Sequence, residues 1–310
     1  MRIVFYGTSA FAVPSLDRLI AQGYRVLQCV TQPDQPQGRG LQPQPSPVKA
    51  AAARLGVPVE APTDLTAAPA ASRALQPDAG VVVSYGRLIP PPLLGAPRHG
   101  MLGVHPSLLP RYRGASPMVW ALLNGDAVTG VTIFRLNERM DAGDILVRRE
   151  APIGARETAG SLSDRLAALG AEALVDGLRA LEQGMARWQP QDERLATTTA
   201  KLTKAHGRIR WTDEAVAIDR QVRALNPWPG TFTSWQAQPL KLWSVSPGAA
   251  TAAGHPGDVT AVTGEGIVVA TGRGALVIQE LQRPGGRRMR VQEFLAGHPL
   301  RVGERFGTDA

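Results

Sequence analysis

Residues 100–114 read GMLGVHPSLLPRYRG, and the first part of this stretch decides the fold class. Residues 101–105 form a short apolar run that ends in His105 and is followed by a loop with two prolines. Short apolar runs interleaved with helix-like stretches are typical of a doubly wound, mostly parallel sheet. Residues 1–188 are therefore predicted to be an α/β domain. The strands expected around 101–105 cover residues 3–6, 25–31, 57–60, 80–84, 129–136 and 145–149.

Three helices of this domain leave clear signals. One is expected at residues 14–20, and another begins with Ser46 as N-cap and Pro47 at its first position. Leucines from Leu162 to Leu181 recur on one face and predict a long packing helix. Residues 32–47 contain five prolines and two glycines, so they are expected to lack regular structure.

The C-terminal third has a different pattern. Residues 189–206 are polar and irregular and are interpreted as an interdomain linker. Residues 207–310 contain short strand-like runs separated by glycine turns, which predicts a small, OB-like β-barrel domain with one helix at 216–225. The strands are expected at residues 207–211, 231–235, 239–245, 257–262, 266–270 and 275–281.

Composition restricts the class of protein. The net charge is +8, and residues 201–310 carry 14 Lys/Arg against 9 Asp/Glu. A basic C-terminal third fits a domain that touches phosphates, although a bias of the coding sequence toward arginine explains it equally well. Cys29 is the only cysteine, and neither a signal peptide nor a membrane span is indicated. We therefore expect a cytoplasmic protein.

His105 and Asp141 are the candidate chemical groups. His105 ends an expected central strand, at the edge where open α/β sheets bind ligands. Such a histidine alone is more often structural, but Asp141 lies in a glycine-containing turn after another strand of the same domain. A carboxylate can hold a histidine in one tautomer or handle a proton itself.

The sequence does not show the residue patterns of covalent acyl transfer, metal binding or dinucleotide binding. There is no G-x-S-x-G sequence and no cysteine near a histidine, so covalent acyl transfer has no nucleophile. His105 has no second histidine at ligand spacing, so no metal is expected. The first strand is not followed by G-x-G-x-x-G, so a dinucleotide site is not indicated.

The motif around His105 resembles that of the folate-dependent formyltransferases. Their central motif is an asparagine, a histidine two residues later, and then Ser-Leu-Leu-Pro, with the catalytic aspartate in an Asp-x-Gly turn. Here His105, residues 107–110 and the Asp141-Ala142-Gly143 turn match. The resemblance extends nearly end to end with a member that acts on the methionine of initiator tRNA. Further matching segments are residues 2–8, 11–14, 31–34, 38–40, 46–49, 85–86, 157–160, 226–230 and 284–289.

The resemblance implies an activity and a set of site residues. The formyl group of the co-substrate 10-formyltetrahydrofolate is expected to pass to the amine of initiator methionyl-tRNA, without metal, in translation initiation. In the family the asparagine and histidine stabilise an oxyanion, and the aspartate moves a proton through a water. His105 and Asp141 are thus expected to be catalytic in a monomer. The resemblance assigns Ser107, Leu108, Leu109, Pro110, Leu88 and Ile89 to the folate, and the 32–47 loop, with Arg39, to the acceptor end of the tRNA. The excess of basic residues at 201–310 adds Lys201, Lys204, Arg208, Arg287 and Arg288 as candidate tRNA contacts.

Position 103 departs from the family pattern, because Gly103 stands where the motif has its asparagine. Three interpretations remain open. The enzyme works more slowly, with His105 and a water or backbone amide; or the chain is a catalytically impaired paralogue that keeps tRNA or folate binding; or another donor such as Asn137 substitutes. The 32–47 loop also has Arg39 as its only basic residue before Lys49, which weakens its predicted contact with the acceptor stem.

One rival activity uses the same catalytic domain. A formyltransferase acting on an amino sugar nucleotide would share the His105 motif. The basic second domain and the Asn-Pro-Trp-Pro-Gly sequence at 226–230 favour tRNA. A formylation assay separates both activities from a binding protein that has lost catalysis.

Overall fold

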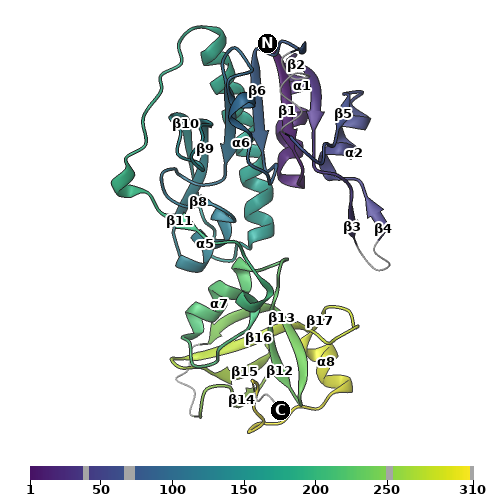
Figure 1. Cartoon of the computed structure of the whole chain (residues 1–310). Helices are drawn as coiled ribbons and strands as arrows, with labels where there is room; N and C mark the ends of the chain where they lie inside the picture. Colours follow the sequence, from purple (N-terminus) through teal and green to yellow (C-terminus); the bar gives the residue numbers. More distant parts are fainter. Residues whose placement is uncertain (38–41, 66–73, 249–253, 308–310) are drawn as a thin grey trace. The chain divides into compact units, whose positions relative to one another are not determined.

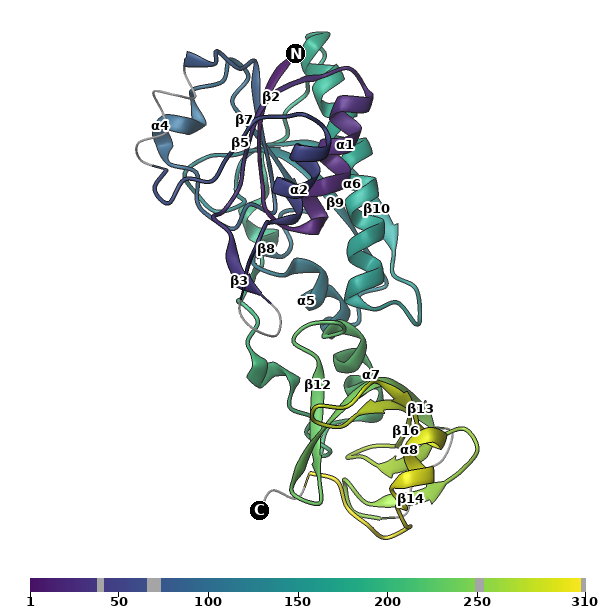
Figure 2. The same cartoon turned by 90° about the vertical axis from the view of Figure 1, so that its right-hand side faces the viewer.

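The computed structural model describes residues 1–37, 42–65, 74–248 and 254–307. The chain folds into two compact units, whose elements are labelled in Figures 1 and 2. The units are interleaved in sequence, whereas the predicted domains 1–188 and 207–310 were continuous. The first unit contains residues 1–117, 128–152 and 163–199, and the second contains residues 118–127, 153–162 and 200–310.

The first unit is built on a seven-stranded sheet of order β10-β9-β7-β6-β1-β2-β5. Its strands are β1 (Arg2–Gly7), β2 (Arg25–Val30), β5 (Val59–Glu60), β6 (Ala79–Val83), β7 (Met101–His105), β9 (Val128–Arg135) and β10 (Ile145–Pro152). The five strands from β7 to β5 pair in parallel, and β9 and β10 add an antiparallel edge. Every residue of β7 is buried, as expected of a strand covered on both faces.

Helices cover both faces of this sheet, which confirms the predicted doubly wound arrangement. Figure 2 shows α1 (Val13–Ala21), α2 (Pro47–Arg54) and α6 (Ala159–Glu182) on one face and α4 (Pro91–Leu94) on the other. Ser46 caps α2 as predicted, because its side chain accepts a hydrogen bond from the Lys49 N–H at 3.1 Å. None of the described helices is long and apolar enough to cross a membrane.

The proline-rich loop contains a short hairpin, so the expectation that it lacks regular structure was wrong. Strands β3 (Gln35–Gln37) and β4 (Gln42–Gln44) pair in antiparallel register. Pro36 lies directly opposite Pro43. Antiparallel ladders alternate between hydrogen-bonded and non-hydrogen-bonded pairs, so two opposed prolines can share a position that needs no N–H donor.

The second unit contains a six-stranded antiparallel sheet of order β12-β13-β16-β15-β14, with β17 pairing β16. Its core includes Trp211, Ile218 of α7, and Phe294 of α8. The elements are α5 (Pro117–Asn124), α7 (Ala215–Ala224), β12 (Thr231–Trp235), β13 (Gln238–Gly248), β14 (Val259–Val262), β15 (Ile267–Ala270), β16 (Ala275–Gln282), β17 (Met289–Arg290) and α8 (Val291–Gly297).

The strand predicted at residues 207–211 is absent. A 3-10 turn at Lys204–Gly207 and a single bridge between Arg208 and Phe232 stand in its place. The side chain of Gln221 donates hydrogen bonds to the carbonyl oxygens of His206 at 2.7 Å and Arg208 at 3.0 Å. A side chain of α7 therefore satisfies backbone acceptors that a strand ladder would otherwise use.

Candidate active site

His105 ends β7 and is only 6% exposed. Its Nε2 atom lies 2.9 Å from the backbone carbonyl oxygen of Tyr112. Because a carbonyl oxygen can only accept, Nε2 carries the hydrogen and donates it. The other ring nitrogen, Nδ1, lies 3.6 Å from Oδ2 of Asp141. The structure thus brings the two predicted catalytic residues together.

Asp141 is held in an uncommon backbone conformation. Its φ angle is +50°, in the left-handed region where aspartate is better tolerated than most residues. Its Oδ2 atom accepts a 2.8 Å hydrogen bond from the Gly114 N–H. Gly143 completes the turn, because a Cβ atom there would lie 1.7 Å from the Arg135 carbonyl oxygen. The turn therefore approaches β9 more closely than any side chain at 143 would permit.

Hydrogen bonds also fix the loop that follows His105. Ser107 Oγ donates to the Arg111 carbonyl oxygen at 2.6 Å. Thr132 Oγ1 donates to the Ser107 carbonyl oxygen at 2.7 Å and accepts from the Leu109 N–H at 3.1 Å. Ser107, Leu109 and Thr132 are fully buried. Sequence reasoning missed Thr132, because nothing in a buried strand marks a threonine as the anchor of a distant loop.

The residues predicted to bind folate come from two loops. Leu108 and Pro110 follow β7, while Leu88 and Ile89 follow β6. Since β6 and β7 are parallel neighbours, both loops lie at the carboxyl edge of the sheet. Leu88 is 72% exposed, but Ile89 is buried in the hydrophobic core. The assignment of these side chains to the folate remains a prediction.

Gly103 faces the ring of Phe134 on β9. A Cβ atom built at position 103 would lie 2.4 Å from Cε1 and 2.7 Å from Cζ of Phe134, and 2.8 Å from Cδ1 of Leu136. The Phe134 ring also meets the His105 ring edge to face, with centroids 6.4 Å apart. Bulk from β9 therefore occupies the space beside Gly103. Asn137, the alternative donor, is exposed and accepts a hydrogen bond from the Arg139 N–H.

Residues 189–199 pack on the first unit, although the sequence predicted a linker from 189 to 206. Strand β11 (Thr198–Thr199) pairs with β8 (Arg113–Gly114), and the Tyr112 N–H donates to Thr197 Oγ1 at 2.8 Å. Glu193 accepts hydrogen bonds from the buried Arg113 and from Arg139. These bonds hold the pKa of the Glu193 carboxyl below its usual range, and the bonds from Arg113 have the largest effect.

The predicted tRNA-binding residues fall into two groups. Lys201, Lys204 and Arg208 are exposed, and neither lysine has an ion pair within the described residues. Arg287, in contrast, pairs with Glu293 at 2.8 Å, and Arg288 pairs with Glu280 and lies over the Trp243 ring. Arg39 lies outside the described residues.

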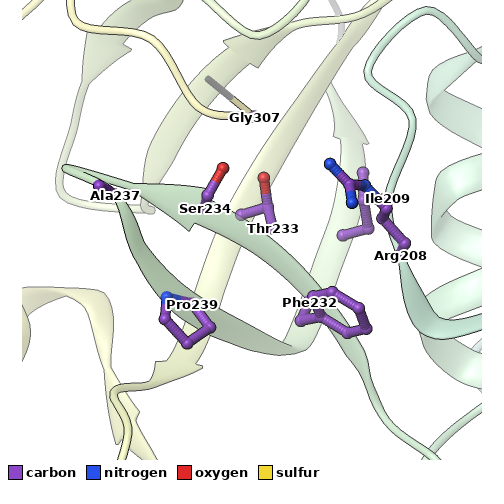
Figure 3. A pocket seen from close by; sticks show the side chains of 8 residues that line it. All are labelled: Arg208, Ile209, Phe232, Thr233, Ser234, Ala237, Pro239 and Gly307. Atoms are coloured by element: carbon purple, nitrogen blue, oxygen red, sulfur yellow. The ribbon is translucent and has the colours of Figure 1, made fainter. Parts of the chain in front are cut away.

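Arg208 lines a pocket of about 220 Å³ in the second unit. Figure 3 shows its guanidinium on one side of this pocket, near the hydroxyl groups of Thr233 and Ser234, with the Phe232 ring below. The pocket combines a cation, hydroxyl groups and an aromatic ring, which are the groups that nucleic-acid-binding surfaces use.

No cluster of three or more His, Cys, Asp or Glu side chains suited to a metal occurs among the described residues. Burial raises the pKa of the Cys29 thiol to about 12, so this thiol is not a ready nucleophile.

Comparisons with known proteins show the family to which the chain belongs. Residues 1–178 match the formyl transferase family, and residues 201–299 match the formyl transferase C-terminal domain. The methionyl-tRNA formyltransferase of Geobacter metallireducens is 45% identical over 99% of both chains. That of Methylococcus capsulatus is also 45% identical, over 99% of this chain and 100% of its own.

Solved structures share the fold at lower identity. HypX from Aquifex aeolicus in complex with tetrahydrofolic acid has a TM-score of 0.68 and 21% identity over 98% of this chain. The present chain spans about half of that protein, 48% of its length. An N-formyltransferase from Helicobacter canadensis, in complex with folinic acid and dTDP-3-aminofucose, has a TM-score of 0.68 and 15% identity. The match covers 89% of this chain and 98% of the Helicobacter canadensis chain.

These matches fix the class of protein: the chain belongs to the formyl transferase family. Relatives that align with it from end to end at 41–45% identity include methionyl-tRNA formyltransferases from several bacteria. The family predicted from the sequence is therefore confirmed.

Proposed function

We propose that the chain transfers the formyl group of 10-formyltetrahydrofolate to the amine of initiator methionyl-tRNA. The observation that carries this proposal is the His105–Asp141 pair, 3.6 Å apart at the carboxyl edge of the parallel sheet. It occurs in a chain whose end-to-end relatives are methionyl-tRNA formyltransferases. Two solved formyltransferases with sugar-linked ligands or names resemble the chain at 15% identity, which supports the shared fold alone.

His105 is suited to stabilise negative charge on the formyl oxygen. As the amine nitrogen attacks the formyl carbon, a new C–N bond forms and the carbonyl oxygen gains charge. Because Nε2 donates to the Tyr112 carbonyl, Nδ1 is the ring nitrogen left to face this oxygen, and it donates to the oxygen when it carries a hydrogen. The Asp141 carboxylate lies 3.6 Å from Nδ1, where its negative charge attracts a hydrogen on this nitrogen. Preorganised donors of this kind contribute about 2.7–4 kcal/mol each.

Asp141 is suited to transfer the proton of the attacking amine through a water molecule. Its Oδ2 atom accepts from the Gly114 N–H, whereas Oδ1 has no hydrogen bond within the described residues. Oδ1 can therefore hold the water that takes the proton from the attacking amine. When the bond between the formyl carbon and the folate nitrogen breaks, that proton returns to the folate nitrogen. No covalent enzyme intermediate is needed.

The proposal is tested by a formylation assay with purified protein. Charged initiator tRNA and 10-formyltetrahydrofolate should give formyl-methionyl-tRNA, while an amino sugar nucleotide in place of the tRNA should give no product. Formylation of the sugar but not of the tRNA would establish the rival activity. No product with either acceptor, from a protein that still binds tRNA or folate, would identify an impaired paralogue.

The tRNA is proposed to contact the second unit. The salt dependence of tRNA affinity tests which basic residues of this unit make the contact. Each phosphate neutralised adds a little under one unit to the slope of log affinity against log salt. Lys201→Ala with Lys204→Ala should flatten the slope by up to about 2 units. Arg287→Ala with Arg288→Ala should flatten it by less, because their guanidinium groups already pair with Glu293 and Glu280.

The two double variants are matched controls, since each removes two positive charges. Equal slopes for both would mean that net charge, and not contact, determines the salt dependence. A larger loss of slope for Arg287→Ala with Arg288→Ala would place the tRNA on the β16–β17 turn instead.

We further propose that the protein is a cytoplasmic monomer. Light scattering of the purified chain tests the oligomeric state.

A further inference from the structure

The side chain of Gln191 joins the Asp141 turn to the loop that follows His105. Its Nε2 group donates to the carbonyl oxygens of Asp141 at 2.8 Å and Gly143 at 2.7 Å. Its Oε1 atom accepts from Nε of Arg113 at 3.0 Å and from Nη2 at 2.8 Å. A primary amide has two N–H donors and two acceptor sites, so these four bonds use all of them and fix its orientation.

Arg113 closes the connection on the other side. Its side chain is buried, and it also binds both carboxylate oxygens of Glu193 at 3.0 Å. The next residue, Gly114, donates its N–H to Oδ2 of Asp141 at 2.8 Å. A ring of bonds thus runs from the Asp141 carboxylate through Gly114, Arg113 and Gln191 back to the Asp141 backbone. The backbone and the carboxylate of one residue are held from two directions.

This arrangement explains how Asp141 keeps its backbone conformation. Its φ of +50° belongs to a sparsely populated region, and such residues persist where the surroundings over-determine them. The carbonyl oxygens on both sides of the turn, those of Asp141 and Gly143, are held by one amide group. Rotation of the turn out of the left-handed region would break these bonds and move the carboxylate away from His105 Nδ1.

We propose that Gln191 is a positioning residue of the active site, which holds the Asp141 turn so that its carboxylate faces His105. The inference rests on the proposed function, because it assumes that this carboxylate takes part in formyl transfer. Gln191 itself touches no reacting atom in this scheme. The segment at 189–199, which the sequence presented as a linker, is then part of the catalytic unit.

Gln191→Glu tests the proposal most sharply. The substitution keeps the length and shape of the side chain and can still accept from Arg113. It replaces the two N–H donors with an oxygen that the Asp141 and Gly143 carbonyl oxygens repel. We expect kcat to fall by about tenfold to a hundredfold, as small misplacements of catalytic groups do, while KM for both substrates changes by less than about twofold.

Glu193→Gln is the matched control. It converts the carboxylate of Glu193, the other partner of Arg113, into a carboxamide of the same size and leaves the four bonds of Gln191 in place. We expect kcat to stay near the parental value. A second readout does not depend on activity: hydrogen exchange of the Gly114 amide, which the Asp141 carboxylate protects, should be faster in Gln191→Glu than in Glu193→Gln.

The outcomes separate this inference from the proposed function. An inactive parent contradicts the proposed function, whereas exchange at Gly114 still tests the bonds of Gln191. A folded Gln191→Glu variant with parental kcat and parental exchange overturns the positioning role. Equal losses of kcat in both variants also overturn it, because Arg113 and not Gln191 would then be decisive. If Gln191→Glu does not fold, Gln191→Met removes the N–H donors together with the oxygen that accepts from Arg113, and a folded Gln191→Met variant with parental kcat and parental exchange then overturns the positioning role.

Discussion

Replacing His105 with alanine, or Asp141 with asparagine, is expected to lower formyl transfer by about a hundredfold or more. The alanine removes the only ring nitrogen that faces Asp141, and the asparagine removes the negative charge that lies 3.6 Å from this nitrogen. Asparagine can still accept from the Gly114 N–H through its amide oxygen, so the turn should persist. The loss should therefore appear in the chemical step.

Single-turnover formylation of methionyl-tRNA, with thermal unfolding measured in parallel, checks this result. The chain offers a matched control in His255, which also lies 3.6 Å from an aspartate, Asp258, but is 85% exposed on the second unit. His255→Ala should keep the parental rate. A folded His105→Ala or Asp141→Asn variant that is as fast as His255→Ala would show that the site is assigned wrongly.

Restoring a carboxamide at position 103 is expected to raise the rate only when Phe134 is made smaller. The family resemblance implies an asparagine there, and one donor aimed at the oxyanion contributes about 2.7–4 kcal/mol, or about a hundred- to a thousandfold in rate. A Cβ atom at 103 meets Cε1 and Cζ of Phe134 at 2.4 and 2.7 Å. Leucine lacks these two ring atoms, so Phe134→Leu removes the two shortest contacts of an asparagine at position 103 and leaves the 2.8 Å contact with Cδ1 at the end of the Leu136 side chain.

Three comparisons separate the effect of the new hydrogen-bond donor from the effects of side-chain size. Gly103→Asn alone should be destabilised, because overpacking costs about 1–3 kcal/mol, and should gain little rate. Gly103→Ala with Phe134→Leu fills the space without a donor, so it should stay near the rate of Phe134→Leu. Only the asparagine–leucine pair should exceed the parent in single-turnover formylation. A well-folded pair no faster than its alanine counterpart would contradict the missing-donor interpretation.

The sequence predicted much of the catalytic unit because the signals there are local. Short apolar runs marked β1, β2, β6 and β7, and the Ser46-Pro47 pair marked the start of α2. Local patterns misled at the β3–β4 hairpin, where opposed prolines share one position of the ladder. They misled again at residues 207–211, where a side chain of α7 satisfies the backbone. The first miss depends on two strands of one loop that pair with each other, and the second depends on a side chain of another element.

By itself, the sequence determined the family, the doubly wound sheet, and His105 and Asp141 as a candidate pair, because strand ends and motif spacing are readable in one dimension. The tertiary structure alone decided which nitrogen of His105 faces Asp141, since the Tyr112 carbonyl takes the other. It also decided that Phe134 fills the space beside Gly103 and that Gln191 holds the Asp141 turn. These contacts join residues 31 and 50 positions apart in the chain, and only packing brings such groups within bonding distance.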